Sequence, residues 1–224
     1  MTTKVITIDT QILKKNEITA NENRELFKQH RVLAINVLSS PGSGKTTLLV
    51  RTCSTLKKKL RVAVSVGDLQ TEADALRIAG SGVPVVQINT GTACHLDAHM
   101  VQLSLKALPL AATDILFIEN VGNLVCPANF DIGEHLKVVL LSVAEGEEKP
   151  LKYPPIFQHA DCVCINKTDL LPYVDFKINQ CRENLKRICP NAPVFEFSCR
   201  TGEGLSAWHD WLLDKWAALS GEAC

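Results

Sequence analysis

The sequence has no excess of charge of either sign, no long apolar run and no internal repeat. Its 24 basic and 24 acidic residues balance, which argues against non-specific binding to nucleic acid or to a membrane surface. No apolar stretch approaches the roughly 20 residues that a membrane helix requires. The first residues, Met-Thr-Thr-Lys-Val, lack the charged-then-apolar layout of a secretory signal. We therefore expect a cytoplasmic protein with no nucleic-acid or membrane partner.

The nine cysteines do not follow the pattern of a disulfide framework, because they are odd in number and spread along the chain. This usage is typical of a reduced, intracellular protein. A chain of 224 residues, 46% of them apolar, is long enough for one large α/β domain and short for two.

From Val32 onward, apolar strands alternate with helical segments. We predict strands at 32–38, 62–66, 83–88, 114–119, 137–143, 161–165 and 193–197. We predict helices at 44–59, 71–80, 94–107, 174–188 and 204–218. Near-continuous apolar strands separated by helices are typical of an α/β fold with a mostly parallel twisted sheet and helices on both faces. Ligands of such sheets bind beyond the carboxyl ends of the strands.

Two segments stand apart from this alternation. Residues 1–31 are predicted to be an N-terminal extension, with a short extended piece at Lys4–Ile8 and a polar helix at Asn16–His30 that packs on the core of the domain formed by residues 32–224. The second segment, residues 144–155, is polar and rich in proline, so we expect a surface loop there.

A glycine-rich turn joins the first strand to the first long helix. Residues 39–47 read Ser-Ser-Pro-Gly-Ser-Gly-Lys-Thr-Thr, and a strand, such a turn and a helix opening on Lys-Thr-Thr make the phosphate-binding P-loop arrangement. Lys45 would reach the outer phosphates, and the Thr46 hydroxyl would hold Mg²⁺. The residues expected to bind the nucleotide phosphates are Gly42, Ser43, Gly44, Lys45, Thr46 and Thr47. The general pattern has glycine where this chain has Ser39, and spacing alone does not explain that departure.

The motif Asn-Lys-Thr-Asp follows the sixth strand and selects the base. The carboxylate of Asp169 would accept two hydrogen bonds from guanine, whereas adenine would leave it unpaired. Asn166 would pair with the other edge of the purine or brace the loops, and the stem of Lys167 would cover the ring. Backbone N–H groups near Ser198 and Cys199 would meet the guanine carbonyl. The sequence therefore predicts GTP or GDP as the ligand.

Acidic residues follow two further strands. Asp68 and Glu119 would bind Mg²⁺ directly or through water, Asp74 is a further candidate, and Glu72 is the least favoured. Each of these acids could instead be a helix cap or a salt-bridge partner. The residues assigned to catalysis are Lys45, Asp68 and Glu119. Because no glutamine or histidine is evidently placed to orient the attacking water, we expect slow intrinsic GTP hydrolysis.

Cysteine and histidine gather after the third and fourth strands. Cys94 and His95 fall where we predict a helix to begin, and a helix N-terminus lowers the pKa of a thiol. His99 lies four residues after His95, on the same helical face. Cys126 follows the fourth strand, whose carboxyl end shares a sheet edge with the third. Thiolate and imidazole ligands suit Zn²⁺ or Ni²⁺.

Cys94, His95 and Cys126 are the expected ligands and His99 is a less favoured fourth, so the set falls short of the four ligands of a closed structural zinc site. An incomplete set favours a metal shared by two copies across a two-fold axis, hence a homodimer with the metal at or near its interface. It also favours metal exchange, which a delivery protein requires. The alternative is that His95 caps a helix while Cys94 and Cys126 are inert, buried thiols.

These motifs resemble those of the nickel-inserting GTPases of hydrogenase maturation, the HypB family. The resemblance rests on the P-loop, Thr-Gly-x-x-Cys-His-Leu-Asp-Ala, Ile-Glu-Asn-Val-Gly-Asn-Leu-Val-Cys-Pro and Asn-Lys-Thr-Asp. It implies a P-loop GTPase that is a cytoplasmic dimer and couples GTP binding to nickel delivery. The implied partners are a nickel-insertion accessory protein and the large subunit of [NiFe]-hydrogenase. The metal-site residues of the family correspond to Cys94, His95 and Cys126. Residues 1–31 lack the cysteine or histidine motif with which some members store nickel.

Three other functions fit parts of the pattern. A urease-type nickel GTPase would carry Cys-Pro-His, whereas here Cys126 and Pro127 are followed by Ala128. A P-loop small-molecule kinase would leave the cysteines as packing residues, and the guanine-type motif at Asp169 disfavours it. A metal buffer would keep only vestigial nucleotide binding.

Overall fold

The protein is described here by a computed structural model that covers residues 8–69 and 72–221. Most of the extended piece expected at Lys4–Ile8 lies outside the described residues, and Ile8 is already the first residue of a helix. Among the described residues, no helix combines the length and the apolar character that crossing a membrane needs.

The seven predicted strands form one sheet in which every pair is parallel, in the order β3-β2-β4-β1-β5-β6-β7. The strands are β1 (Leu33–Ser39), β2 (Val62–Asp68), β3 (Val85–Asn89), β4 (Ile115–Glu119), β5 (Leu136–Ser142), β6 (Cys162–Asn166) and β7 (Val194–Glu196). Their near-continuous burial, complete in β1, β4 and β6, is what a parallel sheet covered on both faces requires. The predicted α/β fold is confirmed.

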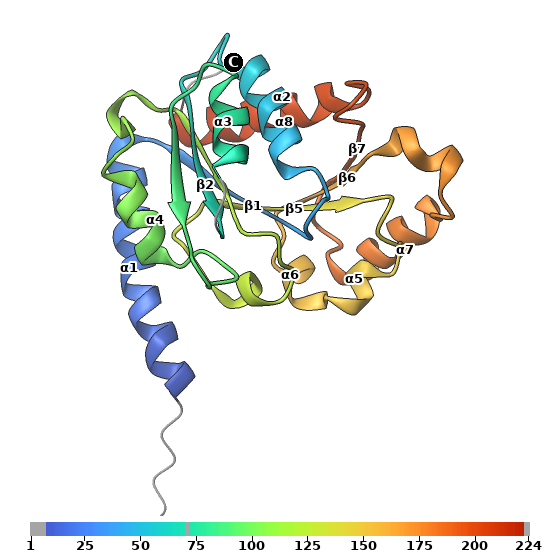
Figure 1. Cartoon of the computed structure of the whole chain (residues 1–224), viewed down its shortest axis with the longest axis horizontal. Helices are drawn as coiled ribbons and strands as arrows, with labels where there is room; N and C mark the ends of the chain where they lie inside the picture. The colour runs from blue at the N-terminus through green and yellow to red at the C-terminus, as the bar shows by residue number, and fades with distance from the viewer. Residues whose placement is uncertain (1–7, 70–71, 222–224) are drawn as a thin grey trace, which may run out of the picture.

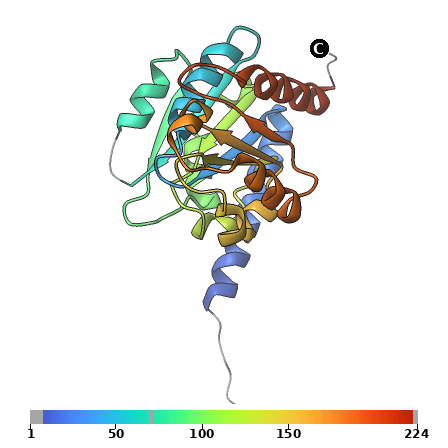
Figure 2. The same ribbon diagram turned by 90° about the vertical axis from the view of Figure 1, so that its right-hand side faces the viewer.

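The α-helices are α1 (Ile8–His30), α2 (Lys45–Leu56), α3 (Ala73–Ala79), α4 (Ala98–Leu105), α5 (Lys149–Lys152), α6 (Pro154–Gln158), α7 (Ile178–Ile188) and α8 (Leu205–Ser220). Three short 3₁₀ segments are η1 (Leu110–Ala112), η2 (Cys126–Asn129) and η3 (Thr168–Tyr173). One face of the sheet packs against α2, α3 and α8. The other face packs against α1 and α4 at one end and against α6 and α7 at the other. The two helical layers are visible in Figures 1 and 2.

Two local predictions were wrong. The helix expected at 94–107 begins only at Ala98, because the side chain of Asp97 accepts a hydrogen bond from Met100 N and supplies the N-cap. The segment 144–155 is not a plain loop, since it contains α5 and the start of α6. Its prolines lie in the first turns of these helices, where a missing N–H costs no intrahelical hydrogen bond.

The register of the central strands places the functional segments. Strand β1 lies between β4 and β5, and Val37 of β1 pairs with Glu119 at the end of β4. The chain leaves β1 into the P-loop and then α2. The carboxyl ends of β1 and β4 therefore open side by side, at the edge where such sheets bind ligands.

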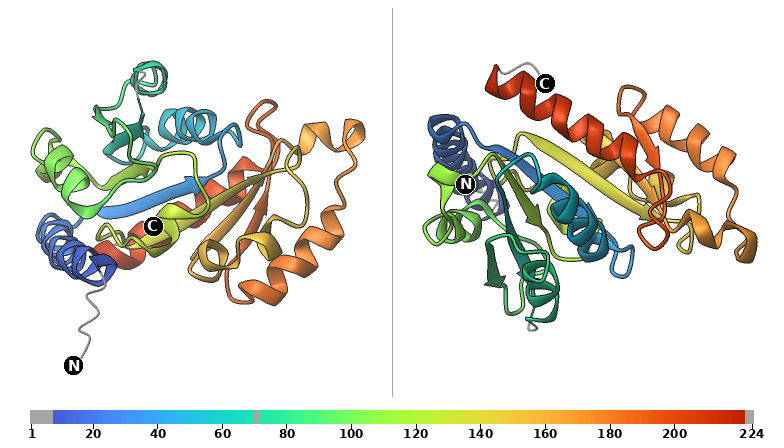
Figure 3. Two further views of the ribbon diagram at one scale, coloured as in Figure 1. Left: turned by 60° about the horizontal axis from the view of Figure 1, so that its bottom comes forward. Right: turned by 90° about the horizontal axis from the view of Figure 1, so that it is seen from above.

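Helix α8 closes the larger core cluster, and Figure 3 shows it lying across one face of the sheet. Trp208 is fully buried, stacks on Trp211 at 5.5 Å between ring centroids, and donates from Nε1 to Thr52 Oγ1 at 3.0 Å. This side chain ties the last helix to α2, the helix that begins at the P-loop.

Replacing this anchor should destabilise the whole domain. We expect Trp208→Ala to lower the free energy of unfolding by about 3–5 kcal/mol, because a large buried side chain is lost and its cavity fills only in part. Urea unfolding followed by circular dichroism measures the change. Trp216→Ala, on the same helix but only partly buried, is the control and should cost clearly less. Equal losses in the two variants would contradict the assignment of Trp208 as the anchor.

Candidate functional site

The phosphate loop turns into α2 at Gly44. This residue is the N-cap of α2 and has φ 101°, a backbone conformation that favours glycine. A side chain there would also collide with Asn166, whose Nδ2 lies 2.5 Å from the position of a Cβ. The N-terminus of α2 thus faces the loop, as binding of phosphate oxygens requires.

Ser39 has a partner that explains its presence. The Nζ of Lys45 donates to Ser39 Oγ at 2.9 Å, and both side chains are buried. Burial lowers the pKa of Lys45, while the nearby carboxylate of Glu119 acts in the opposite direction. The hydroxyl of Ser39 therefore solvates the lysine ammonium when no phosphate is bound, which a glycine could not do.

Glu119 and Thr46 form the second polar pair of the site. The hydroxyl of Thr46 donates to Glu119 Oε1 at 2.9 Å. Burial raises the pKa of Glu119 to about 7, against the opposing effect of Lys45. The other carboxylate oxygen, Oε2, is buried and has no hydrogen-bond partner among the described residues. A hydroxyl beside an unsatisfied carboxylate oxygen fits a hard cation such as Mg²⁺.

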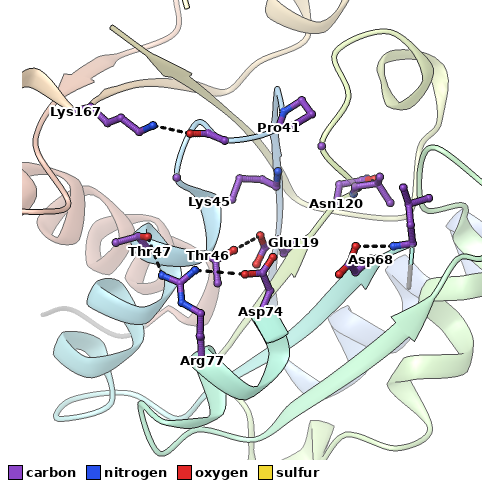
Figure 4. Close-up of a pocket in the computed structure, with 16 residues that line it drawn as sticks. Pro41, Lys45, Thr46, Thr47, Asp68, Asp74, Arg77, Glu119, Asn120 and Lys167 are labelled. Atoms are coloured by element: carbon purple, nitrogen blue, oxygen red, sulfur yellow. Dashed lines mark hydrogen bonds and ion pairs between the residues drawn. The ribbon is translucent and has the colours of Figure 1, made fainter. Parts of the chain in front are cut away.

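A cavity of about 490 Å³, which we call the phosphate cavity, opens above this pair and is shown in Figure 4. Asp68 and Asp74 line it together with the P-loop, as the sequence led us to expect, and Gly122 lines it as well. The Oδ1 of Asp68 accepts from Leu69 N at 2.6 Å. Glu72, the least favoured candidate, is exposed just before α3.

The guanine-type motif contacts the P-loop directly. Asn166 donates to Ser43 O at 2.9 Å, and its Oδ1 accepts from Cys199 N at 3.1 Å. Of the two roles considered for Asn166, the structure shows the bracing one. The Nζ of Lys167 donates to Gly42 O at 2.6 Å, so Lys167 also links the motif to the P-loop.

A smaller cavity, of about 300 Å³, lies beside the motif. Asp169 and Lys167 line it, and Ser198 Oγ donates to Asp169 Oδ1 at 2.5 Å. One expectation needs correction. The N–H groups of Ser198 and Cys199 already bond within the protein, to Glu203 O and to Asn166 Oδ1. Ser198 instead presents its hydroxyl to the carboxylate of Asp169.

The folded chain brings Cys94, His95 and Cys126 together. Their ligand atoms all lie within 4.8 Å of one another, and all three residues are partly exposed. A hydrogen bond between the two thiols, followed by burial, raises the pKa of Cys94, and burial lowers that of His95. The neutral imidazole that results is the form that binds metal.

The helix-dipole argument for Cys94 was wrong. Because α4 begins at Ala98, Cys94 and His95 lie in the loop before the helix, and His95 is not its cap. His95 and His99 therefore do not share a helical face. His99 is exposed and lies outside the three-residue cluster, and it lines a separate cavity of about 270 Å³.

Three further side chains hold the cluster in place. Asn123 donates from Nδ2 to Cys94 O at 3.4 Å, and its Oδ1 accepts from Cys126 N, also at 3.4 Å. Asn120 accepts from Leu96 N at 3.0 Å. The ring of Phe130 packs on His95, with 3.9 Å between the centroids. The loop of Cys94 and His95 is thus bonded to the segment that follows Glu119 and contains Cys126.

A family model described as the nucleotide-binding domain of CobW, HypB and UreG matches residues 33–196 of this chain. The hydrogenase maturation factor HypB of Rhizobium leguminosarum bv. viciae is 52% identical over 209 residues, which cover 93% of this chain and 70% of that relative. The chain belongs to the HypB family. The resemblance seen in the sequence motifs is therefore confirmed.

Solved HypB structures share the fold. A crystal structure of HypB from Helicobacter pylori in complex with nickel superposes with a TM-score of 0.87 at 41% identity, covering 91% of this chain and 96% of that one. HypB from Archaeoglobus fulgidus gives a TM-score of 0.85 at 37% identity, covering 91% of this chain and 99% of that one.

Sequence reasoning missed several residues of this HypB-family site. Arg77 lines the phosphate cavity and donates to Thr47 Oγ1 at 3.2 Å. It lies one helical turn after Asp74, on the same face of α3, so the sequence could have predicted that it joins that acid at the site. Glu145 accepts from Ser43 Oγ at 2.5 Å, and Lys149 donates to a second P-loop serine. No sequence motif links the segment 144–155 to the P-loop.

Ser39→Ala tests whether the Ser39 hydroxyl is the partner that stabilises the buried ammonium of Lys45. Without nucleotide, we expect the free energy of unfolding to fall by about 1–3 kcal/mol, because a buried ammonium loses its partner. With saturating GDP the difference should shrink, since phosphate oxygens replace the hydroxyl. Urea unfolding with and without GDP measures both values. The control is Ser54→Ala, whose hydroxyl bonds only within α2. A loss that is equally large with GDP bound would contradict this account.

Proposed function

We propose that this protein is a GTP-hydrolysing metallochaperone that delivers nickel for the maturation of [NiFe]-hydrogenase. One observation carries the proposal: a single segment, Glu119 to Cys126, has its first residue in the phosphate cavity and its last in the Cys/His cluster. The names of the relatives, hydrogenase maturation factor and a HypB in complex with nickel, agree with this function. The expected partners are a nickel-insertion accessory protein and the hydrogenase large subunit, met in the cytoplasm.

The residues of the phosphate cavity support GTP hydrolysis because they can position the phosphates and stabilise their negative charge. Lys45 exchanges Ser39 for an outer phosphate oxygen, and the N-terminus of α2 binds the inner phosphates. Thr46 and Glu119 would hold Mg²⁺, with Asp68 and Asp74 close by, and the ion would neutralise charge on the transferred phosphoryl group. Asp169, oriented by Ser198, supplies the selectivity for guanine.

The metal cluster supports a transferable ion. Cys94, His95 and Cys126 offer two sulfur ligands and one nitrogen ligand, which suit Ni²⁺ and Zn²⁺ alike. Three ligands leave at least one coordination position open, and a second copy of the chain can fill it. We therefore infer a homodimer with the metal near its two-fold axis. His99 lies outside the cluster and is not among the ligands we propose.

The proposed coupling between nucleotide and metal runs through the asparagines. When the cavity changes from GTP to GDP, the contacts available to Glu119 change. Asn120 bonds to the loop of the first two ligands, and Asn123 bonds to Cys94 and Cys126. A shift of this segment therefore alters the spacing of the ligands. Linkage then requires the metal affinity to differ between the nucleotide states.

Asp169→Asn tests the nucleotide assignment. Guanine presents two donors to the carboxylate, so the amide should weaken GDP binding at least about a hundredfold. Xanthine presents one donor and one acceptor, so the variant should bind xanthosine diphosphate more tightly than GDP. Binding of fluorescent analogues measures both affinities, and the xanthine arm shows that the variant is folded. An unchanged preference for GDP would contradict the assignment of Asp169.

Metal titration tests the other half of the function. We expect Cys94→Ala and Cys126→Ala each to weaken Ni²⁺ binding at least about tenfold, because each removes a thiolate ligand. In wild type, the affinity should differ between GDP and a non-hydrolysable GTP analogue, with the oligomeric state followed in parallel. Cys189→Ala, outside the cluster, is the control. Equal affinities in the two nucleotide states would eliminate the coupling while leaving the metal site intact.

A further inference from the structure

Helix α1 lies against both of the loops that carry the proposed metal ligands. It runs beside α4 at one end of the sheet, as Figures 1 and 3 show. One loop leads from Cys94 and His95 into α4, and the other continues from Cys126 towards β5. These loops belong to different connections, from β3 to α4 and from β4 to β5, so no regular ladder of backbone hydrogen bonds fixes the distance between them.

Asn16 bonds to both loops at once. Its Nδ2 donates to Asp131 O at 2.6 Å, and its Oδ1 accepts from Ala98 N at 2.8 Å. Ala98 lies three residues after His95, and Asp131 lies five residues after Cys126. A single amide thus bridges the two ligand-bearing loops close to their ligands.

Asn23 repeats the bridge two helical turns later, on the same face of α1. Its Nδ2 donates to Ala98 O at 2.8 Å and to Ile132 O at 3.0 Å. The side chain is fully buried. The backbone N–H and C=O of Ala98 are therefore both bonded to α1, one to each asparagine.

The second loop is shaped to fit the helix. Gly133 has φ 89°, and a Cβ at this position would lie 2.5 Å from Ala20 O. Only glycine permits so close an approach at this backbone conformation. Arg24 adds an ion pair, in which its Nη2 donates to both carboxylate oxygens of Asp131, at 2.9 and 2.7 Å. This charge-assisted contact holds the second loop against α1.

We propose that α1 is a clasp that sets the spacing of the two metal-binding loops, with Asn16 and Asn23 as positioning residues. This proposal rests on the metal site proposed above. Ligands already held at the right spacing bind a metal without the entropic cost of ordering the loops. The described contacts of these two asparagines are with the loops and not with the phosphate cavity, so loss of the clasp should weaken metal binding and spare nucleotide binding.

A purely structural role for α1 makes a different prediction. The helix also buries Ala20 and Phe27 in the core, and this packing stabilises the fold whatever the polar contacts do. If the asparagines only added to that stability, replacing one would lower the stability of the whole chain. It would leave the metal affinity of the folded protein unchanged.

The test compares Asn16→Ala with Asn21→Ala in the full chain. Both changes remove one amide from the same helix, but Asn21 is exposed and accepts only from Arg24 Nη1, whereas the contact of Arg24 with Asp131 uses the other nitrogen, Nη2. We expect Asn16→Ala to bind Ni²⁺ about fivefold to tenfold more weakly than Asn21→Ala in chelator competition. The thiolate-to-nickel absorption band should saturate at correspondingly higher nickel concentration. Affinity for GDP should agree within about twofold in both variants.

Amide hydrogen exchange of the metal-free protein supplies a second readout that needs no nickel. Exchange in segments 94–98 and 127–133 should be faster in Asn16→Ala than in Asn21→Ala and unchanged elsewhere. Equal exchange and equal nickel affinity in the two variants would overturn the clasp, and so would faster exchange spread over the whole chain. A wild type that binds no nickel would instead overturn the metal site, while the exchange comparison would still decide the clasp.

Discussion

The pairing of β1 with β4 is the constraint on which the rest of the site depends. Because Val37 pairs with Glu119, the carboxylate at the end of β4 faces the P-loop that leaves β1. It therefore reaches the Thr46 hydroxyl at 2.9 Å. A slip of this register would move the carboxylate away from the phosphate cavity. It would also shift Cys126, seven residues later, away from Cys94. The phosphate cavity and the Cys/His cluster are thus positioned by one strand pair.

Burial makes the phosphate cavity responsive to its ligand. Lys45 and Glu119 are both buried. Burial lowers the pKa of Lys45 and raises the pKa of Glu119, so it favours the neutral form of each side chain. Ser39 and Thr46 supply the hydroxyls that partner them. These are weak substitutes for a phosphate oxygen and a divalent cation. Glu119 Oε2 is buried and has no hydrogen-bond partner among the described residues, so the protein satisfies the charges of this site only in part.

Whether a feature can be predicted from the sequence depends on how far apart along the chain the interacting residues lie. All seven strands and the P-loop were predictable, since apolar runs and glycine-rich turns are local patterns. The start of α4 also carried a local signal, since Asp97 is an N-cap residue three positions before Met100, but the prediction overlooked it. The Cys/His cluster was predicted from strand ends alone, whereas His99 was assigned to it only through the misplaced helix start. Contacts such as Asn16 to Asp131 span 115 residues and leave no local signal.

The two loops of the Cys/His cluster are held by buried amides as well as by the apolar packing of Leu96 and Ile132, and the two kinds of contact differ in their effect. A polar chain runs from Asn120 to Asn36 at 3.3 Å, and from Asn36 to Glu134 at 3.2 Å. Glu134 then accepts from Ile132 N at 2.9 Å, in the loop that α1 holds. An apolar contact tolerates sliding, whereas a buried hydrogen bond that slips leaves an unsatisfied group, which costs about 1–3 kcal/mol. A network of this kind fixes discrete loop positions instead of a continuous range. Discrete positions are what a nucleotide must select between if it is to change the affinity for a metal held by both loops.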